Sequence, residues 1–221
     1  MIKKLSDYKS IIFDCDGVIL DSNKIKTNAF YSVAKEYNEQ AAIELIAFHK
    51  ANGGISRYKK FDLFRKELLP KYKINKEVNL DKLINEYSIE VKNGLLNCLI
   101  CSDLNFLKKS TKNIPWSVVS GGDEKEIRYI FKKRNIDYFF EGGIYGSPNT
   151  KEDIFKKCLE KGTFKNPALY IGDSKYDYIS ASKFNIDFVF LSIWTEFREW
   201  KEYTSLKNIF TINKISDLIN N

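Results

Sequence analysis

The chain has 221 residues, of which 43% are hydrophobic and 29% are charged. This is enough apolar material for one core, or for a core with a smaller inserted module, and it excludes an intrinsically disordered chain. The net charge is +7, which would attract an anion such as phosphate or simply reflect a lysine-rich surface. The basic residues are scattered and form no recognisable nucleic-acid-binding motif, so we expect no nucleic-acid partner.

No apolar run is long enough to span a bilayer, and the N-terminal segment lacks the apolar stretch of a signal peptide. We therefore expect a cytoplasmic protein with no membrane partner, in which the four cysteines are reduced. Cys98 and Cys101 form a C-x-x-C pair within an apolar run. This pair could serve redox chemistry or half a zinc site, but no second pair accompanies it, which favours buried packing.

In chain order, the first apolar run, Ser10–Phe13, predicts a buried strand. The stretch 23–95 then has helical periodicity and predicts four helices, at Ile25–Tyr37, Gln40–Lys50, Lys59–Leu69 and Leu80–Lys92. Beyond it, predicted strands at Trp116–Val119, Ala168–Ile171 and Phe188–Leu191 alternate with predicted helices at Glu124–Arg134, Glu152–Lys161 and Tyr176–Phe184. The last stretch, Trp194–Asn221, predicts a closing strand and helix.

Continuous apolar strands that alternate with helices are typical of a parallel sheet covered by helices on both faces. The predicted fold class is therefore α/β, with a doubly wound parallel sheet. The helical stretch after the first strand interrupts this pattern, and we interpret it as an inserted α-helical module.

The most informative motif follows the first predicted strand and reads Phe13-Asp14-Cys15-Asp16-Gly17. Ligands of open α/β sheets bind at the carboxyl edge of the strands, where the two carboxylates would lie. Gly17 would allow the chain to turn away sharply. Because a solvated loop could also carry two acidic residues, this motif is not specific by itself.

A second acidic pair, Asp173 and Asp177, follows the predicted strand Ala168–Ile171. Protein-bound Mg²⁺ is usually held by one or two carboxylates together with water and phosphate, so Asp14 and Asp173 could hold this ion between two strand ends. Helix capping by Asp173 or Ser174, with Asp177 in the first turn, explains the same residues. The two roles are compatible.

Two further motifs could hold a phosphate group. Ser120-Gly121-Gly122 places a hydroxyl and a flexible backbone before a helix, where anions bind well. Lys151 directly precedes a predicted helix and could pair with phosphate and with a carboxylate. Each has a simpler explanation, namely an ordinary strand-to-helix turn and one lysine among many.

The order D-x-D-G, S-G-G, K and G-D-S-x-x-D, each after a predicted strand, is specific in combination. It resembles the haloacid dehalogenase superfamily, and the resemblance covers residues 1–22 and about 96–195. The helical insert is similar to the cap of the phosphoglycolate phosphatase and β-phosphoglucomutase branch. The resemblance implies a Rossmann-like core domain of residues 1–22 and 96–221 and a cap domain of residues 23–95.

The resemblance also implies roles for the motif residues. Asp14 would be the nucleophile, and the side chain of Asp16 would act as general acid and base, which favours phosphoryl chemistry over dehalogenation. Ser120, Gly121 and Lys151 would bind the transferring phosphoryl group. The implied Mg²⁺ ligands are Asp14, the backbone carbonyl of Asp16, Asp173 and, directly through water or as an orienting residue, Asp177.

Substrate choice is expected to depend on the cap turn at residues 49–60, which is polar and rich in glycine. Arg57 is the first candidate for contacting an anionic or hydroxyl-rich substrate, because its planar fork suits pairs of oxygens. Asn52, Ser56 and Lys60 are weaker candidates. His49 could contact the substrate or serve a mutase, but we interpret it as a packing or surface residue. A solvated connection between helices is the alternative for the whole turn.

We therefore expect a Mg²⁺-dependent phosphatase that acts on a small phosphorylated metabolite through a phospho-aspartate. The segment N-G-G-I-S-R resembles hydrolases that are encoded with bacterial surface-polysaccharide genes. This resemblance favours a sugar, polyol or amino-alcohol phosphate as the substrate. A phosphomutase that uses the same intermediate is the alternative, and a non-enzymatic binding protein on this fold is a third hypothesis. The sequence leaves a monomer or a homodimer open.

Overall fold

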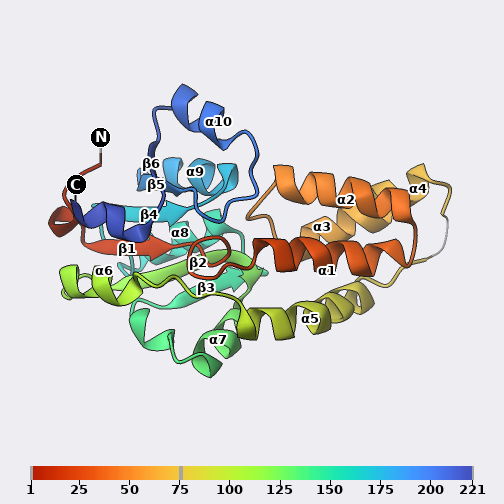
Figure 1. Ribbon diagram of the computed structural model, residues 1–221, viewed down its shortest axis with the longest axis horizontal. Helices are drawn as coiled ribbons and strands as arrows, with labels where there is room; N and C mark the ends of the chain where they lie inside the picture. The colour runs from red at the N-terminus through yellow and green to blue at the C-terminus, as the bar shows by residue number, and fades with distance from the viewer. Residues whose placement is uncertain (1, 75–76, 221) are drawn as a thin grey trace.

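The computed structural model describes residues 2–74 and 77–220. The predicted domain ranges also include four residues outside this description: Met1, Asn75, Lys76 and Asn221. An α/β core occupies one side of the molecule and a group of helices the other (Figure 1). This helical insert lies between the first and second strands of the core. The predicted fold class, a doubly wound parallel sheet with an inserted helical module, is confirmed.

The described residues form one six-stranded sheet in which each neighbouring pair of strands is parallel. The strands are β1 Ser10–Phe13, β2 Trp116–Asp123, β3 Ile144–Ser147, β4 Ala168–Gly172, β5 Asp187–Leu191 and β6 Phe210–Ile212. Their order is β3-β2-β1-β4-β5-β6. The order reverses beside β1, and at such a switch point the loops that leave neighbouring strands diverge and open a binding crevice.

The four predicted strands agree with β1, β2, β4 and β5, whereas β3 was not predicted. Its sequence, Ile-Tyr-Gly-Ser, is short and contains glycine, so it lacks the apolar run that identifies a buried strand. β2 is longer than predicted, because it continues past Ser120 to Asp123, with an irregular register between Val119 and Asp123. Near the C-terminus, helix α10 (Trp200–Leu206) precedes β6, and a 3-10 helix (Ile215–Asn220) follows it.

Alternate residues of the strands point to opposite faces of the sheet, which therefore has two apolar layers. Ile11 and Phe13 of β1 belong to one layer, together with residues of α6 (Leu104–Ser110) and α7 (Glu124–Lys133). Ile12 belongs to the other layer, with residues of α8 (Lys151–Glu160) and α9 (Lys175–Ser182). This arrangement buries both faces of the sheet.

The insert, called the cap below, consists of helices α1 Asn23–Lys35, α2 Glu39–Ala51, α3 Arg57–Leu63, α4 Leu69–Lys71 and α5 Leu80–Asn97. The third predicted helix is not one regular α-helix, because a π-helical segment, Phe64–Leu68, joins α3 to α4. Pro70 cannot donate a backbone hydrogen bond, so a regular α-helical ladder cannot run through it. The predicted domain boundaries at residues 22 and 96 stay a prediction.

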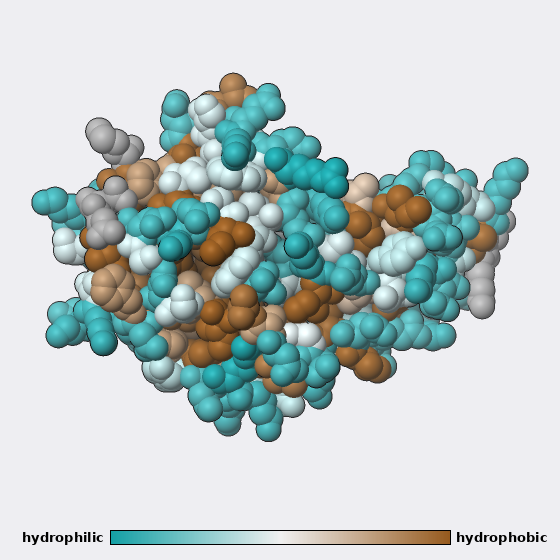
Figure 2. Space-filling model, viewed as in Figure 1, coloured by the Kyte–Doolittle hydropathy of each residue, from teal (hydrophilic) through white to brown (hydrophobic). Residues whose placement is uncertain are grey.

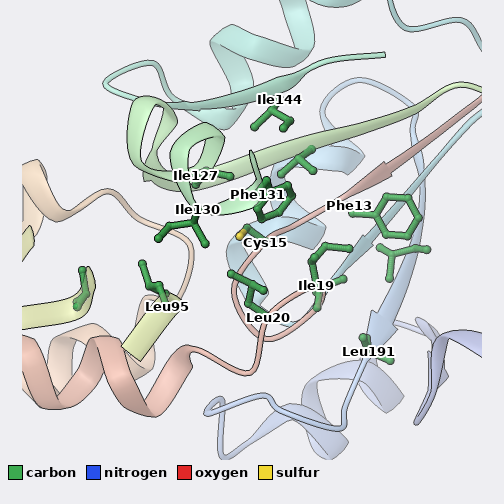
Figure 3. Packing of buried hydrophobic residues seen from close by; sticks show 14 of the residues in the cluster. Phe13, Cys15, Ile19, Leu20, Leu95, Ile127, Ile130, Phe131, Ile144 and Leu191 are labelled. Atoms are coloured by element: carbon green, nitrogen blue, oxygen red, sulfur yellow. The ribbon is translucent and has the colours of Figure 1, made fainter. Parts of the chain in front are cut away.

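The apolar layer that contains Phe13 continues from the core into the cap. Figure 3 shows Leu95, at the end of α5, beside Ile127 and Ile130 of α7, with Leu20 nearby at the start of the connection to α1. The face shown in Figure 2 carries many hydrophilic groups, with apolar groups scattered among them. Among the described residues, no helix combines the length and apolar character needed to cross a membrane.

Candidate functional site

Asp14 lies at the carboxyl end of β1, in the middle of the sheet, and its side chain is almost fully buried. Its backbone N–H donates to Ile171 of the neighbouring strand β4 at 2.9 Å. One carboxylate oxygen accepts a hydrogen bond from the N–H of Cys15 at 2.7 Å, and the other lies 3.0 Å from Nζ of Lys151. Burial raises the pKa of Asp14 to about 7, although Lys151 opposes the shift.

Asp173 follows β4, directly beside the end of β1. Its Oδ2 accepts a hydrogen bond at 2.7 Å from the side-chain amide of Asn23, the first residue of cap helix α1. The chain passes so close at Gly17 that a Cβ there would lie 2.1 Å from this oxygen, and Gly17 also has a φ of +75°. The predicted turn at Gly17 therefore has two reasons, a left-handed backbone and close packing on Asp173.

Asp177 is held rigidly in the first turn of α9. One oxygen accepts hydrogen bonds from the backbone N–H groups of Asp173 and Ser174 and from the Ser174 hydroxyl, which completes a capping box. The other oxygen contacts Nζ of Lys151 and the hydroxyl of Tyr170. The predicted capping role is thus confirmed, and both oxygens of Asp177 are engaged by protein donors.

Asp14, Asp173 and Asp177 each offer a carboxylate oxygen to one buried cluster, in which these oxygens lie within 4.8 Å of one another. Lys151 is the cation that pairs with this cluster among the described residues. Burial and the charges of Asp177 and Asp14 raise the pKa of Asp173. Three carboxylates against one ammonium leave an excess of negative charge, which a dication with oxygen ligands would balance, so these residues fit Mg²⁺.

The Asp16 side chain turns away from this cluster, toward the cap. Its two oxygens accept hydrogen bonds from the Ser22 hydroxyl at 2.6 Å and from Nζ of Lys26 at 2.5 Å. Burial opposes ionisation of Asp16, but Lys26 and Ser22 outweigh it, and the pKa of Asp16 is lowered. Asp16 is therefore a carboxylate in this arrangement, and Lys26 holds the shared proton.

One predicted phosphate motif lies on β2, the strand next to β1, and the other contacts Asp14 directly. Ser120 is buried within β2, and its Oγ accepts a hydrogen bond from the N–H of Gly122 at 3.0 Å. Lys151 begins α8, after the capping residue Thr150, and is also buried. At Gly121, a Cβ would lie 1.9 Å from the carbonyl oxygen of Gly54 in the cap turn, so the cap contacts the core at this motif.

The predicted cap residues have different surroundings. Arg57 is buried and forms an ion pair with Glu126 of α7, donates to Ser88 at 2.9 Å and stacks over the ring of Tyr87. Glu126 raises the pKa of Arg57, although burial opposes this. Asn52 donates to the carbonyl of Phe48 at the end of α2.

Ser56 caps the start of α3 and borders a small second hollow, which Lys151 also borders. The positions of Ser56, Asn52 and Arg57 leave their predicted substrate roles untested.

A cavity of about 60 Å³ lies between the core carboxylates and the cap. Asp14, Asp16, Asp173 and Gly121 border it from the core, and Arg57, Lys60 and His49 border it from the cap. Several side chains at this site were not predicted from the sequence: Asn23, Lys26, Glu126 and Tyr170. Nothing in the sequence separated Lys26 from the other lysines, because its contact with Asp16 depends on how the first cap helix packs on the core.

Four cysteines are free thiols, and Cys98 and Cys101 are half-buried against the main apolar cluster. Cys98 lies 3.4 Å from a guanidinium nitrogen of Arg134. Among the described residues, the only group of acidic, histidine or cysteine side chains close enough to hold a metal is the Asp14 cluster. The packing interpretation of the C-x-x-C pair is therefore favoured over a zinc site.

A model of a protein family described as haloacid dehalogenase-like hydrolase matches residues 11–191. Solved structures similar to this chain include a predicted phosphatase from Clostridium acetobutylicum, with 19% identity, a TM-score of 0.73 and coverage of 96% of this chain and 97% of that chain. A β-phosphoglucomutase from Clostridium difficile has 20% identity, a TM-score of 0.69 and coverage of 96% and 97%.

The HAD-hydrolase YfnB from Bacillus subtilis, in a structure bound to magnesium, has 17% identity, a TM-score of 0.66 and coverage of 99% and 100%. At these identities the likeness shows a shared fold. A comparison with curated proteins gives no match.

Proposed function

Because the chain belongs to the haloacid dehalogenase-like hydrolases, we propose that it is a Mg²⁺-dependent phosphatase that hydrolyses a small phosphate monoester through phosphorylated Asp14. The observation that carries this proposal is the buried cluster at the carboxyl edge of the sheet. There, the carboxylate of Asp14 lies against Lys151 and beside two further carboxylates. Phosphate-ester hydrolysis in water is extremely slow, so an enzyme gains much from a covalent intermediate and from positive charge around the phosphoryl group.

Asp14 and Asp173 would hold the metal ion, with the backbone carbonyl of Asp16 completing the protein ligands that the resemblance implies. Asp177 has both oxygens engaged by Lys151, Tyr170 and the start of α9, which supports an orienting role rather than direct ligation. Bound Mg²⁺ would supply the positive charge that offsets repulsion between the nucleophile and the phosphate.

In the first step, an oxygen of Asp14 attacks phosphorus and the bond from phosphorus to the leaving oxygen breaks. The leaving oxygen takes a proton from the side chain of Asp16, while Lys151 and Ser120 stabilise the charge on the phosphoryl oxygens. In the second step, water gives a proton to the carboxylate of Asp16 and attacks phosphorus. Inorganic phosphate leaves, and the Asp14 carboxylate is restored.

The lowered pKa of Asp16 supports its role as a base in the second step, because the side chain is ionised. The same contact makes Asp16 a poor acid and also raises the pKa of Lys26, so Asp16 must take up a proton before the first step. Three finer points stay predictions. These are a sugar, polyol or amino-alcohol phosphate as substrate, a monomer or homodimer as the oligomeric state, and a cytoplasmic location.

The proposal is tested by incubating the purified protein with Mg²⁺ and a panel of phosphorylated metabolites, with free phosphate as the readout. We expect phosphate release by the wild type, none after chelation of the metal, and none by Asp14→Asn. Glu90→Gln, on the exposed face of α5, is the matched control. An isomeric sugar phosphate in place of free phosphate would indicate the phosphomutase alternative, and an active Asp14→Asn would refute the nucleophile.

A further inference from the structure

Lys60 is a buried cation on the cap side of the cavity. Its side chain, on cap helix α3, is among the largest fully buried side chains of the protein. Among residues 2–74 and 77–220, no carboxylate lies within salt-bridge distance of its Nζ. The contacts of that Nζ are Nδ1 of His49 at 2.7 Å and the ring of Phe30, whose centroid is 5.6 Å away. A buried ammonium without a counter-ion is unfavourable, so its place calls for an explanation.

The other cations that border the cavity each have a carboxylate partner. These pairs are Lys26 with Asp16, Arg57 with Glu126, and Lys50 with Glu196. Lys60 therefore differs from its neighbours, because the described part of the protein provides no anion to it. Burial and the nearby charge of Lys26 lower the pKa of Lys60 to about 7, whereas Asp16 and Asp14 raise it. An anion that arrived in the cavity would favour the charged ammonium.

His49 determines the direction of this ammonium. Burial and the charge of Lys60 lower the pKa of His49, so the imidazole is neutral. A neutral ring that accepts from Lys60 at Nδ1 carries its proton on Nε2. The His49 ring packs against Phe30 at a tilt of 45°, with ring centroids 4.7 Å apart, and this restricts the orientation of the imidazole. The histidine thus occupies one of the three donor directions of Lys60 and leaves the others for a ligand.

We propose that Lys60, positioned by His49, binds a second anionic group on the leaving-group side of the substrate. Both side chains border the same cavity as Asp14 and Asp173, so one small molecule can reach both ends. This inference rests on the proposed function, because the first anionic group is the phosphate attacked by Asp14. It names Lys60, rather than Arg57, as the cap residue that selects the substrate.

The chemistry favours an ester that carries one additional negative charge. A single carboxylate would neutralise the Lys60 ammonium, and the surrounding rings of Phe30 and Tyr87 exclude water and strengthen that pairing. A neutral hydroxyl would leave the buried charge uncompensated. A second phosphate shares this chemistry with larger charge and size, and the experiment below separates it from a carboxylate.

The first measurement uses the Asp14→Asn protein with Mg²⁺, in which turnover is blocked and Lys60 is intact. Binding of phosphoglycerate, glycerol phosphate and glycerol bisphosphate, with the phosphate on a terminal hydroxyl, is measured by calorimetry. We expect phosphoglycerate to bind ~10- to 100-fold more tightly than glycerol phosphate, since a hydrogen bond to a charged group is lost in the latter. Equal affinities would overturn the proposal. Tighter binding of the bisphosphate than of phosphoglycerate would assign the anion as phosphate.

The second measurement introduces Lys60→Met into the same Asp14→Asn protein, with Lys66→Met as the matched control, since Lys66 has an exposed side chain. We expect Lys60→Met to remove the preference for phosphoglycerate over glycerol phosphate and the control to keep it. An equal loss of affinity for both esters would overturn the proposal.

These binding measurements do not depend on turnover. If the Lys60-dependent preference were found while the wild type released no phosphate from any ester, the proposed phosphatase function would fail and the anion site would stand.

Discussion

Replacing Asp173 with asparagine should stabilise the metal-free protein, which is unusual for a change at a buried site. The carboxylate of Asp173 is buried with those of Asp14 and Asp177, and Lys151 pairs with the latter two. An asparagine keeps the shape and still offers Asn23 an oxygen to which it can donate. The substitution therefore removes repulsion and retains the contact to the cap.

The size of the effect follows from the spacing of the charges. Two unit charges 4.8 Å apart repel by about 3.5 kcal/mol at an effective dielectric constant of 20. Partial protonation of the cluster relieves some of this, so we expect a gain of about 2 kcal/mol in the free energy of unfolding. For a chain of this length, that raises the melting temperature by roughly 4–8 °C.

The gain should depend on pH with a definite sign. The folded-state pKa of Asp173 is raised, so between the ordinary carboxyl pKa and the raised value the folded protein binds more protons than the unfolded chain. The stability of the metal-free wild type therefore falls as pH rises through that window. The advantage of Asp173→Asn should be larger near pH 8 than near pH 5.

The assay is thermal unfolding followed by circular dichroism, in chelator and then in excess Mg²⁺. At a Mg²⁺ concentration of about 100 times its dissociation constant, the wild type should gain about 2.7 kcal/mol. Asp173→Asn should gain much less, and Glu90→Gln should behave as the wild type does. The reasoning would be refuted if Asp173→Asn were less stable than the wild type in chelator, or if Mg²⁺ stabilised both equally.

Three further predictions concern the contacts between cap and core. Gly121→Ala should lower phosphatase activity at least tenfold, because the new Cβ would clash with the Gly54 carbonyl and hold the cap away from the core. Steady-state kinetics measure this loss, and full activity would contradict the position of the cap. Lys26→Met should raise the pKa of Asp16 and move the acid limb of the pH–rate profile to higher pH; an unmoved limb would refute the pairing. Glu126→Gln leaves Arg57 without its carboxylate partner, so the free energy of unfolding, measured by chemical denaturation, should fall by about 3 kcal/mol. A loss below about 0.5 kcal/mol would show that the pair is replaceable.

The core of the site could be predicted because its information is local. Asp14 and Asp173 each end an apolar run, and the rule that parallel strands present their carboxyl ends at one edge brings them together. The capping box at Ser174 and Asp177 is likewise contained in four consecutive residues. Ser120 was predicted at a turn and lies inside a longer strand, because the irregular register beyond Val119 lets β2 continue through its glycines.

The cap contacts could not be predicted, because they depend on how two separate groups of elements dock. The planar fork of Arg57 was expected to meet pairs of oxygens, and it does so at Glu126, a residue 69 positions away on a core helix. Lys60 was named from the sequence only as a weaker candidate for contacting the substrate, because its burial could not be seen there. Its burial beside His49 is visible only once the helices of the cap are packed.

The attack of Asp14 on phosphorus is tested most directly by quenching a single turnover in acid and mapping the peptides by mass spectrometry. The wild type should carry a phosphoryl group on the peptide that contains Asp14 during turnover, and the group should disappear once the substrate is consumed. Phosphate release with no phosphorylated peptide at any time, or with the group on another side chain, would contradict the account.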